Sequence, residues 1–567
     1  MIVTSGPGER AAPAAPPRVA AVHFRRPAER PFTAAERATT TILIGGLTRA
    51  HDALLKAAFQ AAGYRVDVLP VPDSGAFQLG KDLGNNGQCN PAYFMVGNLV
   101  QFLRSLEAAG LSRDEIVDRY VFFTAGSCGP CRFGMYEAEY RLALQNAGFD
   151  GFRVLLFQQA DGVKAASGEP GLQFTVDFGL SVFMALNLAD VLNDLAGRIR
   201  PFELTPGTTD RAVADCLATL SARIRSRSRF ELLERLPARL VPTLRRVKPA
   251  TDIATTLGKI WLHLYGRETR EMLREVRARL GEVVVDRLRA KPVVKVTGEF
   301  WAQTTEGDGN FRMFAFLEQQ GAEVVVEPIG TWITYMLWLA QAKFEWRKGL
   351  YGPPRPRWAL HRRLGDELAF QAKRASFALG RTFYTRYYRR LVRELGGIAH
   401  PLVSLDTLGR LAAPYYNVFA MGGEGHMEVA KNIYYTRTKQ CHMVLSLKPF
   451  GCMPSTQSDG VQSAVMSHFP DMIFLPVETS GEGEVHAHSR VQMALGEARA
   501  AARAEFRHAL DATGRTLDEV RAYVAAHPLL RHPFYRVPAE PGVAGTAARF
   551  VRHVGRLMDR RPAPGRV

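Results

Sequence analysis

The chain has 567 residues, of which 47% are hydrophobic, and this is more than one hydrophobic core usually holds. Its formal net charge is +18, yet no nucleic-acid-binding motif accompanies the basic residues, and no apolar run reaches the roughly 20 residues of a membrane helix. Six cysteines are too few for a disulfide scaffold in a chain of this length. We therefore expect a multidomain protein of the reducing cytoplasm, with neither nucleic acid nor a membrane as its partner.

The first expected domain, residues 41–205, follows a leader of residues 1–40 that is rich in Ala, Pro and Arg and is expected to be disordered. Short apolar strands alternate with helical stretches along this domain, which is the pattern of a parallel sheet covered by helices on both faces. The expected strands are a stretch from Thr41 together with Tyr64–Leu69, Tyr120–Thr124 and Phe152–Phe157, and the expected helices are Ala50–Ala62, Pro91–Ala109 and Cys131–Ala147.

A second α/β domain is expected over residues 291–500, after a basic helical connector at 206–290. A helical insertion at 345–410 interrupts this domain, and residues 501–567 form a helical C-terminal region and tail. The expected strands are Pro292–Thr297, Ala322–Val326, Cys441–Leu447 and Met472–Pro476, and the expected helices are Asn310–Gln320, Glu424–Thr436 and Val461–His468. The fold class is therefore α/β, with two similar halves that each hold a parallel sheet and are joined and capped by helical segments.

The basic residues concentrate in two helical stretches, Arg211–Arg289 and Arg347–Arg393. Arg alternates there with Leu, Ala and Glu, as on an ordinary solvated helix face. The charge alone therefore does not choose among polyanionic or acidic partners.

The sharpest local motif is Cys-Gly-Pro-Cys, formed by Cys128 to Cys131 between an expected strand and an expected helix. The loop at the carboxyl end of a parallel strand opens onto the ligand crevice, and a helix N-terminus stabilises the thiolate form of cysteine. The same four residues match the redox motif of thioredoxin. The motif therefore fits either metal binding or dithiol exchange.

Two more cysteines, Cys89 and Cys452, lie in turn-rich loops next to expected elements. Four thiolates gathered in one cleft would meet the requirement of a [4Fe–4S] cluster or part of a larger one. Zinc is an equally acceptable occupant of four thiolates, although it usually binds two Cys-x-x-Cys knuckles and this chain has one. A small buried hydrophobe is the ordinary role of a free cysteine, and it suits Cys216 and Cys441.

Several segments resemble the activase-related proteins of the 2-hydroxyacyl-CoA dehydratase group. They are Gly80–Pro91, Gly126–Arg132, Val296–Phe300, Gly422–Gly425, Lys448–Pro454 and Glu478–Glu482. The resemblance implies two Rossmann-like domains around an oxygen-sensitive iron–sulfur cluster of the 4Fe–4S type or larger. Its metal ligands would be Cys89, Cys128, Cys131 and Cys452.

The resemblance also implies a partner, an ATP-dependent activator protein or domain that delivers low-potential electrons. This chain contains no phosphate-binding loop of the kind that such an ATPase needs, so it would be the electron-accepting half. An acyl-CoA substrate and assembly into a homo- or hetero-oligomer are further expectations. Two other functions stay open: a non-catalytic electron-transfer or assembly component, and a dithiol oxidoreductase.

The remaining candidate residues lie beside these motifs. Each has a simpler alternative role, as a solvated side chain, a buried structural carboxylate or a helix-capping turn. The catalytic candidates are Glu299, Glu478 and Glu482, and the cofactor-binding candidates are Lys81, Arg132, Gly423 and Gly425.

Overall fold

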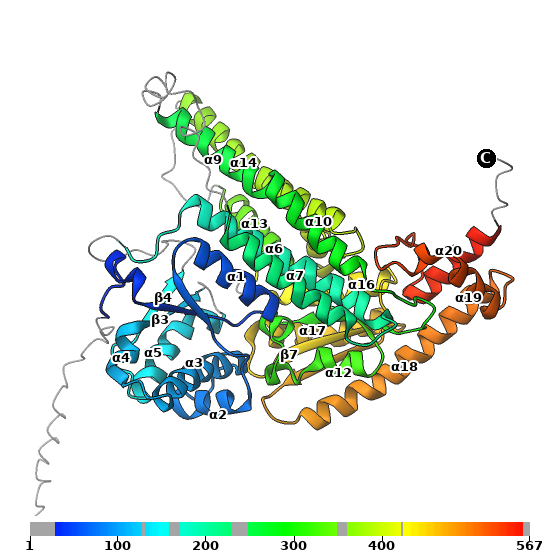
Figure 1. The fold of residues 1–567 in the computed structure, drawn as a ribbon, viewed down its shortest axis with the longest axis horizontal. Coiled ribbons are helices and arrows are strands. Elements are labelled where there is room, and N and C mark those ends of the chain that lie inside the picture. Colours follow the sequence, from blue (N-terminus) through cyan, green and yellow to red (C-terminus); the bar gives the residue numbers. More distant parts are fainter. Residues whose placement is uncertain are drawn as a thin grey trace, which may run out of the picture.

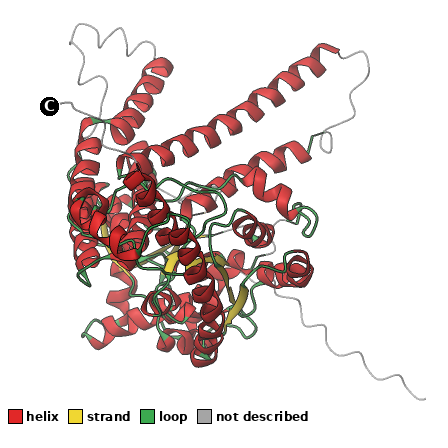
Figure 2. Ribbon diagram, turned by 90° about the vertical axis from the view of Figure 1, so that its right-hand side faces the viewer, coloured by secondary structure: helices red, strands yellow, loops and turns green. Residues whose placement is uncertain are grey.

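The computed structural model describes residues 29–126, 131–157, 170–227, 248–348, 360–420 and 423–559. Helices predominate and surround the strands of two parallel sheets (Figures 1 and 2). The expected α/β fold with parallel sheets is confirmed. Of the cysteines discussed above, Cys128 lies outside the described residues.

The first sheet has four parallel strands in the order β2-β1-β3-β4. The strands are β1 (Thr41–Ile44), β2 (Arg65–Val68), β3 (Tyr120–Ala125) and β4 (Arg153–Phe157). The helices of this half are α1 (Arg49–Ala61), α2 (Ser74–Leu83), α3 (Asn90–Ala108), α4 (Arg113–Arg119), the 3-10 helix η2 (Arg132–Met135) and α5 (Tyr136–Asn146). Helices α3 and α5 pack on one face, while Phe59 of α1 and Phe178 help to cover the other.

The second sheet repeats this arrangement in the order β6-β5-β7-β8. Its strands are β5 (Val293–Gly298), β6 (Glu323–Val325), β7 (Met443–Pro449) and β8 (Phe474–Thr479). Its helices are α11 (Phe300–Thr304), α12 (Met313–Gln319), α13 (Ile329–Trp346), α15 (Leu405–Ala412), α16 (Gly425–Arg437), α17 (Met453–His468) and α18 (Glu484–Asp511). In both sheets the strand order reverses between the first and third strands, which is where open α/β sheets place their ligands.

A helical layer joins the two halves and includes both the expected connector and the expected insertion. Its members are α6 (Val176–Ile199), α7 (Thr208–Arg225), α9 (Lys248–Tyr265), α10 (Arg267–Gly281) and α14 (Leu360–Glu394). Leu188 of α6, Cys216 of α7, Leu273 of α10 and Tyr387 of α14 share one buried core with α1. Cys216 is therefore a small buried side chain, as expected.

One helix is longer and more apolar than the sequence suggested. Val176–Phe202, which is α6 with its short 3-10 extension, passes the length and hydropathy criteria for a membrane span among the described residues. In the fold, 56% of its most apolar window is buried inside the protein.

Both ends of the chain depart from the expected boundaries. Residues 29–40 of the expected leader include a 3-10 helix, Ala34–Ala38, and its Glu36 pairs with the buried Arg153 at 2.9 Å. At the other end, α18 runs through residue 500 and packs with α19 (Leu517–Ala526) and α20 (Thr546–Asp559) around a separate small core.

Candidate functional site

Three cysteines stand at the starts of helices. Cys89 is the N-cap residue of α3, Cys131 that of η2, which leads into α5, and Cys452 that of α17. All three have extended backbone angles, and α3 and α17 carry proline in their first turn. Because a helix N-terminus favours negative charge, each thiol lies where a thiolate is stabilised.

The loops that carry these cysteines meet where the two halves of the protein touch. The Asn90 amide donates a hydrogen bond to the carbonyl of Phe450 at 3.1 Å, and the Asn90 side chain donates to the carbonyl of Thr479 at 2.8 Å. A Cβ atom at Gly451 would lie 3.4 Å from Cys89 Cα and 3.2 Å from Arg132 Nη1. Glycine is needed there, because its φ is +75° and the neighbouring loops approach closely.

The three thiols are free and shielded from solvent to different degrees, since Cys89 and Cys452 are buried and Cys131 is half-buried. Burial, with smaller contributions from nearby Glu424, Glu299 and Cys89, raises the pKa of Cys131 to about 12. Burial also raises the pKa of Cys89 and Cys452. Without a bound cation, these thiols are therefore protonated at neutral pH.

Cys89 has a specific hydrogen-bond partner. The hydroxyl of the buried Tyr136 lies 3.0 Å from Cys89 Sγ. This contact lowers the pKa of the Cys89 thiol, against the larger opposite effect of burial. Tyr136 is thus placed to stabilise negative charge on this sulfur.

Two glutamates, the buried Glu424 and the half-buried Glu299, share the start of the short helix α11. One Glu299 oxygen accepts from the Ala302 amide at 3.0 Å, and Glu424 accepts from the Phe300 amide at 2.6 Å. Burial raises the pKa of Glu299 to about 7 and that of Glu424 to about 8, and neighbouring carboxylates add to both shifts. The pair therefore holds and releases protons near neutral pH, beside the thiols.

A buried polar stripe begins at Glu424, the N-cap residue of α16, and continues along that helix through Glu428 and Lys431. Glu428, one turn after Glu424, accepts hydrogen bonds from Ser455, at 2.9 Å, and from Ser458. Lys431 follows one turn later, and its buried ammonium lies 3.9 Å from Glu327 Oε2. The stripe thus runs from the cysteines into the core of the second half.

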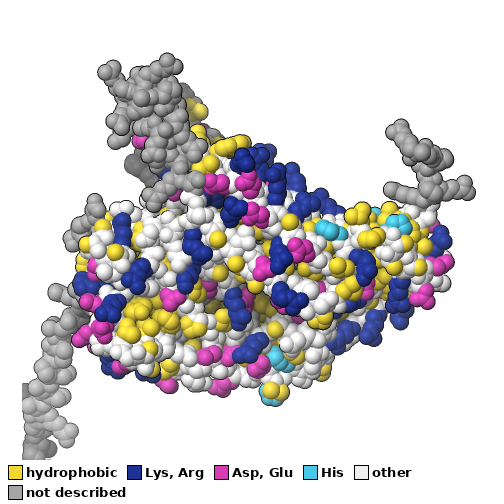
Figure 3. Space-filling view, viewed as in Figure 1, with side chains coloured by type: hydrophobic (Ala, Val, Ile, Leu, Met, Phe, Trp, Pro, Cys, Tyr) yellow, Lys and Arg dark blue, Asp and Glu magenta, His cyan; other side chains and the backbone are white. Residues whose placement is uncertain are grey.

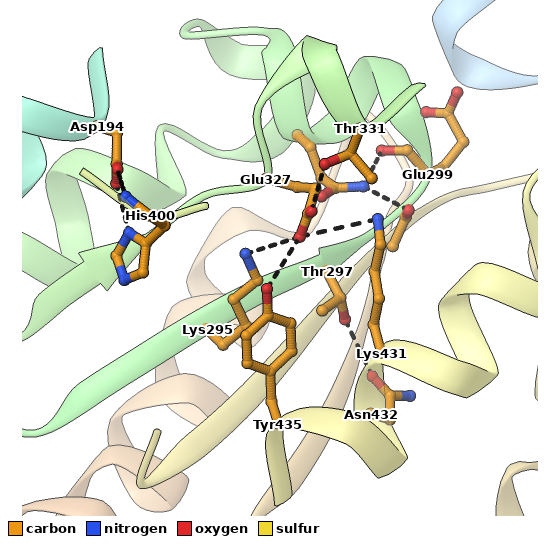
Figure 4. Close-up of polar contacts among 12 residues, drawn as sticks. Asp194, Lys295, Thr297, Glu299, Glu327, Thr331, His400, Lys431, Asn432 and Tyr435 are labelled. Carbon is orange, nitrogen blue, oxygen red and sulfur yellow. Dashed lines mark hydrogen bonds and ion pairs between the residues drawn. The ribbon is translucent and has the colours of Figure 1, made fainter. Parts of the chain in front are cut away.

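Figure 4 shows the inner end of this stripe, where Glu327 lies between two lysines. Lys295 Nζ of β5 is 2.8 Å from Glu327 Oε2, and the Thr331 hydroxyl donates to Oε1 at 2.7 Å. Although burial opposes ionisation, Lys295 and Lys431 lower the pKa of Glu327 to about 2. The carboxyl group of Glu327 is therefore ionised at neutral pH.

A cavity of about 660 Å³ lies between the two halves beside this network. Its lining includes His51, Asp190, Gln303 of α11 and Glu327. Asp190 bridges the halves, because it accepts from the Ile329 amide at 2.8 Å and lies 3.2 Å from His51 Nε2. The cavity has the size and the interdomain position of a small-molecule site.

Not all candidate residues from the sequence lie among the thiols. Glu299 does, and Arg132 lies beside Cys89 with its guanidinium donating to the carbonyl of Gly87 at 2.6 Å. Glu478 is exposed, and the side chains of Glu482 and Lys81 form a surface pair at 4.0 Å. These three residues are on the surface of the described structure, which gives their predicted site roles less support.

Gly423 and Gly425 have a packing reason to be glycine. A Cβ at Gly423 would overlap Pro454 Cγ, and one at Gly425 would lie 3.0 Å from the Pro454 carbonyl oxygen. Gly423 also has a φ of +122°. Both glycines therefore let the start of α16 pack closely against the helix that follows Cys452.

The described residues contain three of the four expected cysteine ligands. Among them, no three His, Cys, Asp or Glu side chains are gathered closely enough to hold a metal ion. Cys89, Cys131 and Cys452 nevertheless supply soft sulfur donors at helix starts, and the fourth expected ligand, Cys128, lies outside the described residues. The donor type fits an iron–sulfur cluster, but the described residues alone do not gather these sulfurs into a metal site.

Glu424, Glu428, Lys431 and Tyr136 were not predicted as site residues from the sequence. The first three have a spacing of four and three residues, which places them on one face of a helix. That spacing was the available signal, but such a face usually meets solvent, and here it is buried.

Comparison with known proteins identifies no family for this chain: no family model matches the sequence, and no curated protein matches it significantly.

Proposed function

We propose that the chain is an iron–sulfur protein related to the 2-hydroxyacyl-CoA dehydratases, which accepts low-potential electrons from an ATP-dependent activator. The substrate of its reductive or dehydratase chemistry would be an acyl-CoA. The observation that carries the proposal is the meeting of the Cys89, Cys131 and Cys452 loops at the junction of two α/β halves. Helix starts supply all three thiols, and each favours an anionic ligand.

In this proposal Cys89, Cys131 and Cys452, with Cys128, hold the cluster, which supplies one-electron transfer at low potential when bound. Arg132 offsets part of the negative charge of the thiolates. Tyr136 donates its hydrogen bond to the sulfur of Cys89. These contacts act against the burial that otherwise keeps the thiols protonated.

Glu299 and Glu424 would supply and take up the protons that accompany reduction or dehydration. Their raised pKa values lie close to neutral pH, where a general acid or base works best. The cavity of about 660 Å³ reaches Gln303, on the same helix whose N-cap is Glu299. A thioester group entering this cavity would thus reach Gln303, one helical turn from Glu299, while the cavity lining that the structure describes includes none of the three cysteines.

The test is anaerobic purification or reconstitution, with assays of iron and acid-labile sulfide and EPR spectroscopy of the reduced protein. We expect stoichiometric iron and sulfide in the wild type and a marked loss in the Ser variants of Cys89, Cys131 and Cys452. Cys216→Ser and Cys441→Ser are matched controls, because these cysteines are also free and buried but lie in other cores. A colourless wild-type protein after strict anaerobic reconstitution would refute the proposal.

A turnover assay distinguishes a catalytic protein from a protein that only carries electrons. With an activator, ATP and reductant, conversion of a 2-hydroxyacyl-CoA or an aromatic acyl-CoA would support catalysis. A cluster-loaded protein that passes electrons but converts neither substrate would be an electron-transfer component. Insulin reduction that needs only Cys128 and Cys131 would favour dithiol exchange instead.

A further inference from the structure

Helix α9 is apolar on two sides. Its inner side packs on α6, where Lys259 Nζ lies 2.7 Å from Asp177 Oδ2. Its outer side carries Ile253, Leu257 and Trp261, which are 63%, 60% and 66% exposed and lie one helical turn apart. Isolated exposed apolar residues are common, but a continuous row on one helix marks a surface that another body covers.

The neighbouring helix α14 extends this row. Phe383, which is 40% exposed, lines a trough of about 730 Å³ together with Leu257 and Trp261. Leu379, one turn before Phe383 on α14, is 71% exposed. We call the outer sides of α9 and α14 around this trough the trough face. Figure 1 shows that the two helices project from the body of the protein, and the exposed fractions of Leu257, Trp261 and Leu379 show that their side chains on this face are accessible.

Arginines lie at one end of the trough and around it. Arg267 and Arg270, at the start of α10, complete its lining, and the Arg267 side chain is 87% exposed and pairs with Glu271 at 2.6 Å. Arg and Lys outnumber Asp and Glu by nine to three in α14 and by five to three in α10. In Figure 3, Lys and Arg side chains lie interspersed with Asp and Glu on the described surface at the base of the projecting helices.

We propose that the trough face binds the surface of a bilayer that contains anionic phospholipids. A phospholipid places apolar chains next to a phosphate, which matches the order of Leu257 and Trp261 followed by Arg267 and Arg270 along the trough. An exposed Trp with flanking Arg is typical of helices that lie at a membrane interface. A second copy of the chain fits poorly, because it would bring two basic faces together.

The proposal concerns peripheral attachment and is independent of the proposed function. Neither the thiols nor Glu299 belong to the trough face, so loss of attachment leaves cluster content unchanged.

The test is co-sedimentation of the full chain with vesicles of phosphatidylcholine alone or mixed with phosphatidylserine. We expect binding to the mixed vesicles, weakened by added salt, and little binding to phosphatidylcholine alone. Leu257→Glu and the double variant Arg267→Glu/Arg270→Glu should each lower the affinity for mixed vesicles roughly tenfold or more.

Two surface variants elsewhere serve as matched controls. Leu529→Glu changes a leucine that is 75% exposed near the C-terminus, and Arg521→Glu changes an exposed arginine of α19. Both should bind vesicles like the wild type, and thermal unfolding checks that all variants are folded.

Three results would overturn the proposal. One is a wild-type protein that does not sediment with mixed vesicles, and another is sedimentation that Leu257→Glu leaves unchanged. The third is a different occupant: a dimer that Leu257→Glu dissociates, or an acidic Leu/Glu helical peptide that binds the trough face while vesicles do not.

Discussion

Glu299 and Glu424 lie 125 positions apart in the sequence, yet both accept hydrogen bonds from backbone amides of the first turn of α11. Glu424 is buried and Glu299 is half-buried, and the charge of Glu299 disfavours ionisation of Glu424. Two acids held this close share protons rather than ionise independently. The pair can therefore store and release protons at the site. The sequence predicted Glu299 as a candidate but did not predict its pairing with Glu424.

The first prediction concerns stability against pH. Because the pKa values of Glu299 and Glu424 are higher in the folded chain than the ordinary 4.5, the folded state binds more protons above that value. Their contribution to stability is fully present below about pH 4.5 and is lost as the pH rises through about 7 to 8. Glu424→Gln should therefore gain about 1 to 3 kcal/mol relative to the wild type on going from pH 5 to about pH 8.5.

Urea unfolding of the metal-free chain at a series of pH values measures this difference. The control is Glu478→Gln, which changes an exposed carboxylate at the end of β8. If Glu424→Gln and the wild type keep the same difference at every pH, the two acids do not share protons.

The second prediction concerns the ion network around Glu327. Glu327→Gln leaves the ammonium groups of Lys295 and Lys431 buried without a carboxylate, which should cost about 3 to 5 kcal/mol. The wild type should lose the same contribution in acid, from about pH 4.5 down to about pH 2, because the pKa of Glu327 is lowered to about 2. Chemical unfolding of both proteins measures it. Lys81→Ala, which breaks the exposed pair with Glu482, should cost at most about 1 kcal/mol.

The third prediction uses two glycines with positive φ. Gly423→Ala places a methyl group against the ring of Pro454, so it should lower the free energy of unfolding by about 2 kcal/mol or more. Gly63→Ala is the matched control, because its φ is +89° but nothing lies within 4 Å of the added atom, so only about 1 kcal/mol of backbone strain is expected. Equal losses of stability in the two variants would show that the start of α16 yields to the added methyl group.

The fourth prediction concerns the hydrogen bond between Tyr136 and Cys89. Tyr136→Phe removes about 1 kcal/mol of stabilisation from the Cys89 thiolate, so anaerobic alkylation of Cys89 at fixed pH should slow several-fold. Mass spectrometry of the labelled cysteine gives the rate. Tyr140→Phe, on the same helix and buried against Phe122, should leave that rate unchanged. A faster reaction in Tyr136→Phe would mean that the hydroxyl protects the sulfur instead of activating it.

The strands were predictable because each is a short apolar run between turn residues. Strand β3 begins at the expected Tyr120, and β4 ends at the expected Phe157. Helix starts were harder: α17 begins at Met453 rather than at the expected Val461, although Pro454 in its first turn is a signal of a helix start. Helix α2 was missed, because its ten residues hold three glycines or serines that read as a loop.

The site residues, too, were predictable only where a local sequence pattern marked them. A cysteine after a strand was predicted to lie at a sheet end, and Cys452 does follow β7. Glu299 was predicted, but Glu424 and Glu428 were not, because charged residues at helical spacing usually form a solvated face. Only the packing of α16 against α17 and β5 turns this face inward, and contacts between segments so far apart in the chain leave no local mark.

The hydrogen bonds from Asn90 to Phe450 and Thr479 tie a helix start of the first half to two loops of the second. The place of Cys89 relative to the Cys452 loop is therefore set by contacts between the two halves and not within either one. Sulfur donors that come from both halves are thus held near one another by the same contacts that hold the halves together.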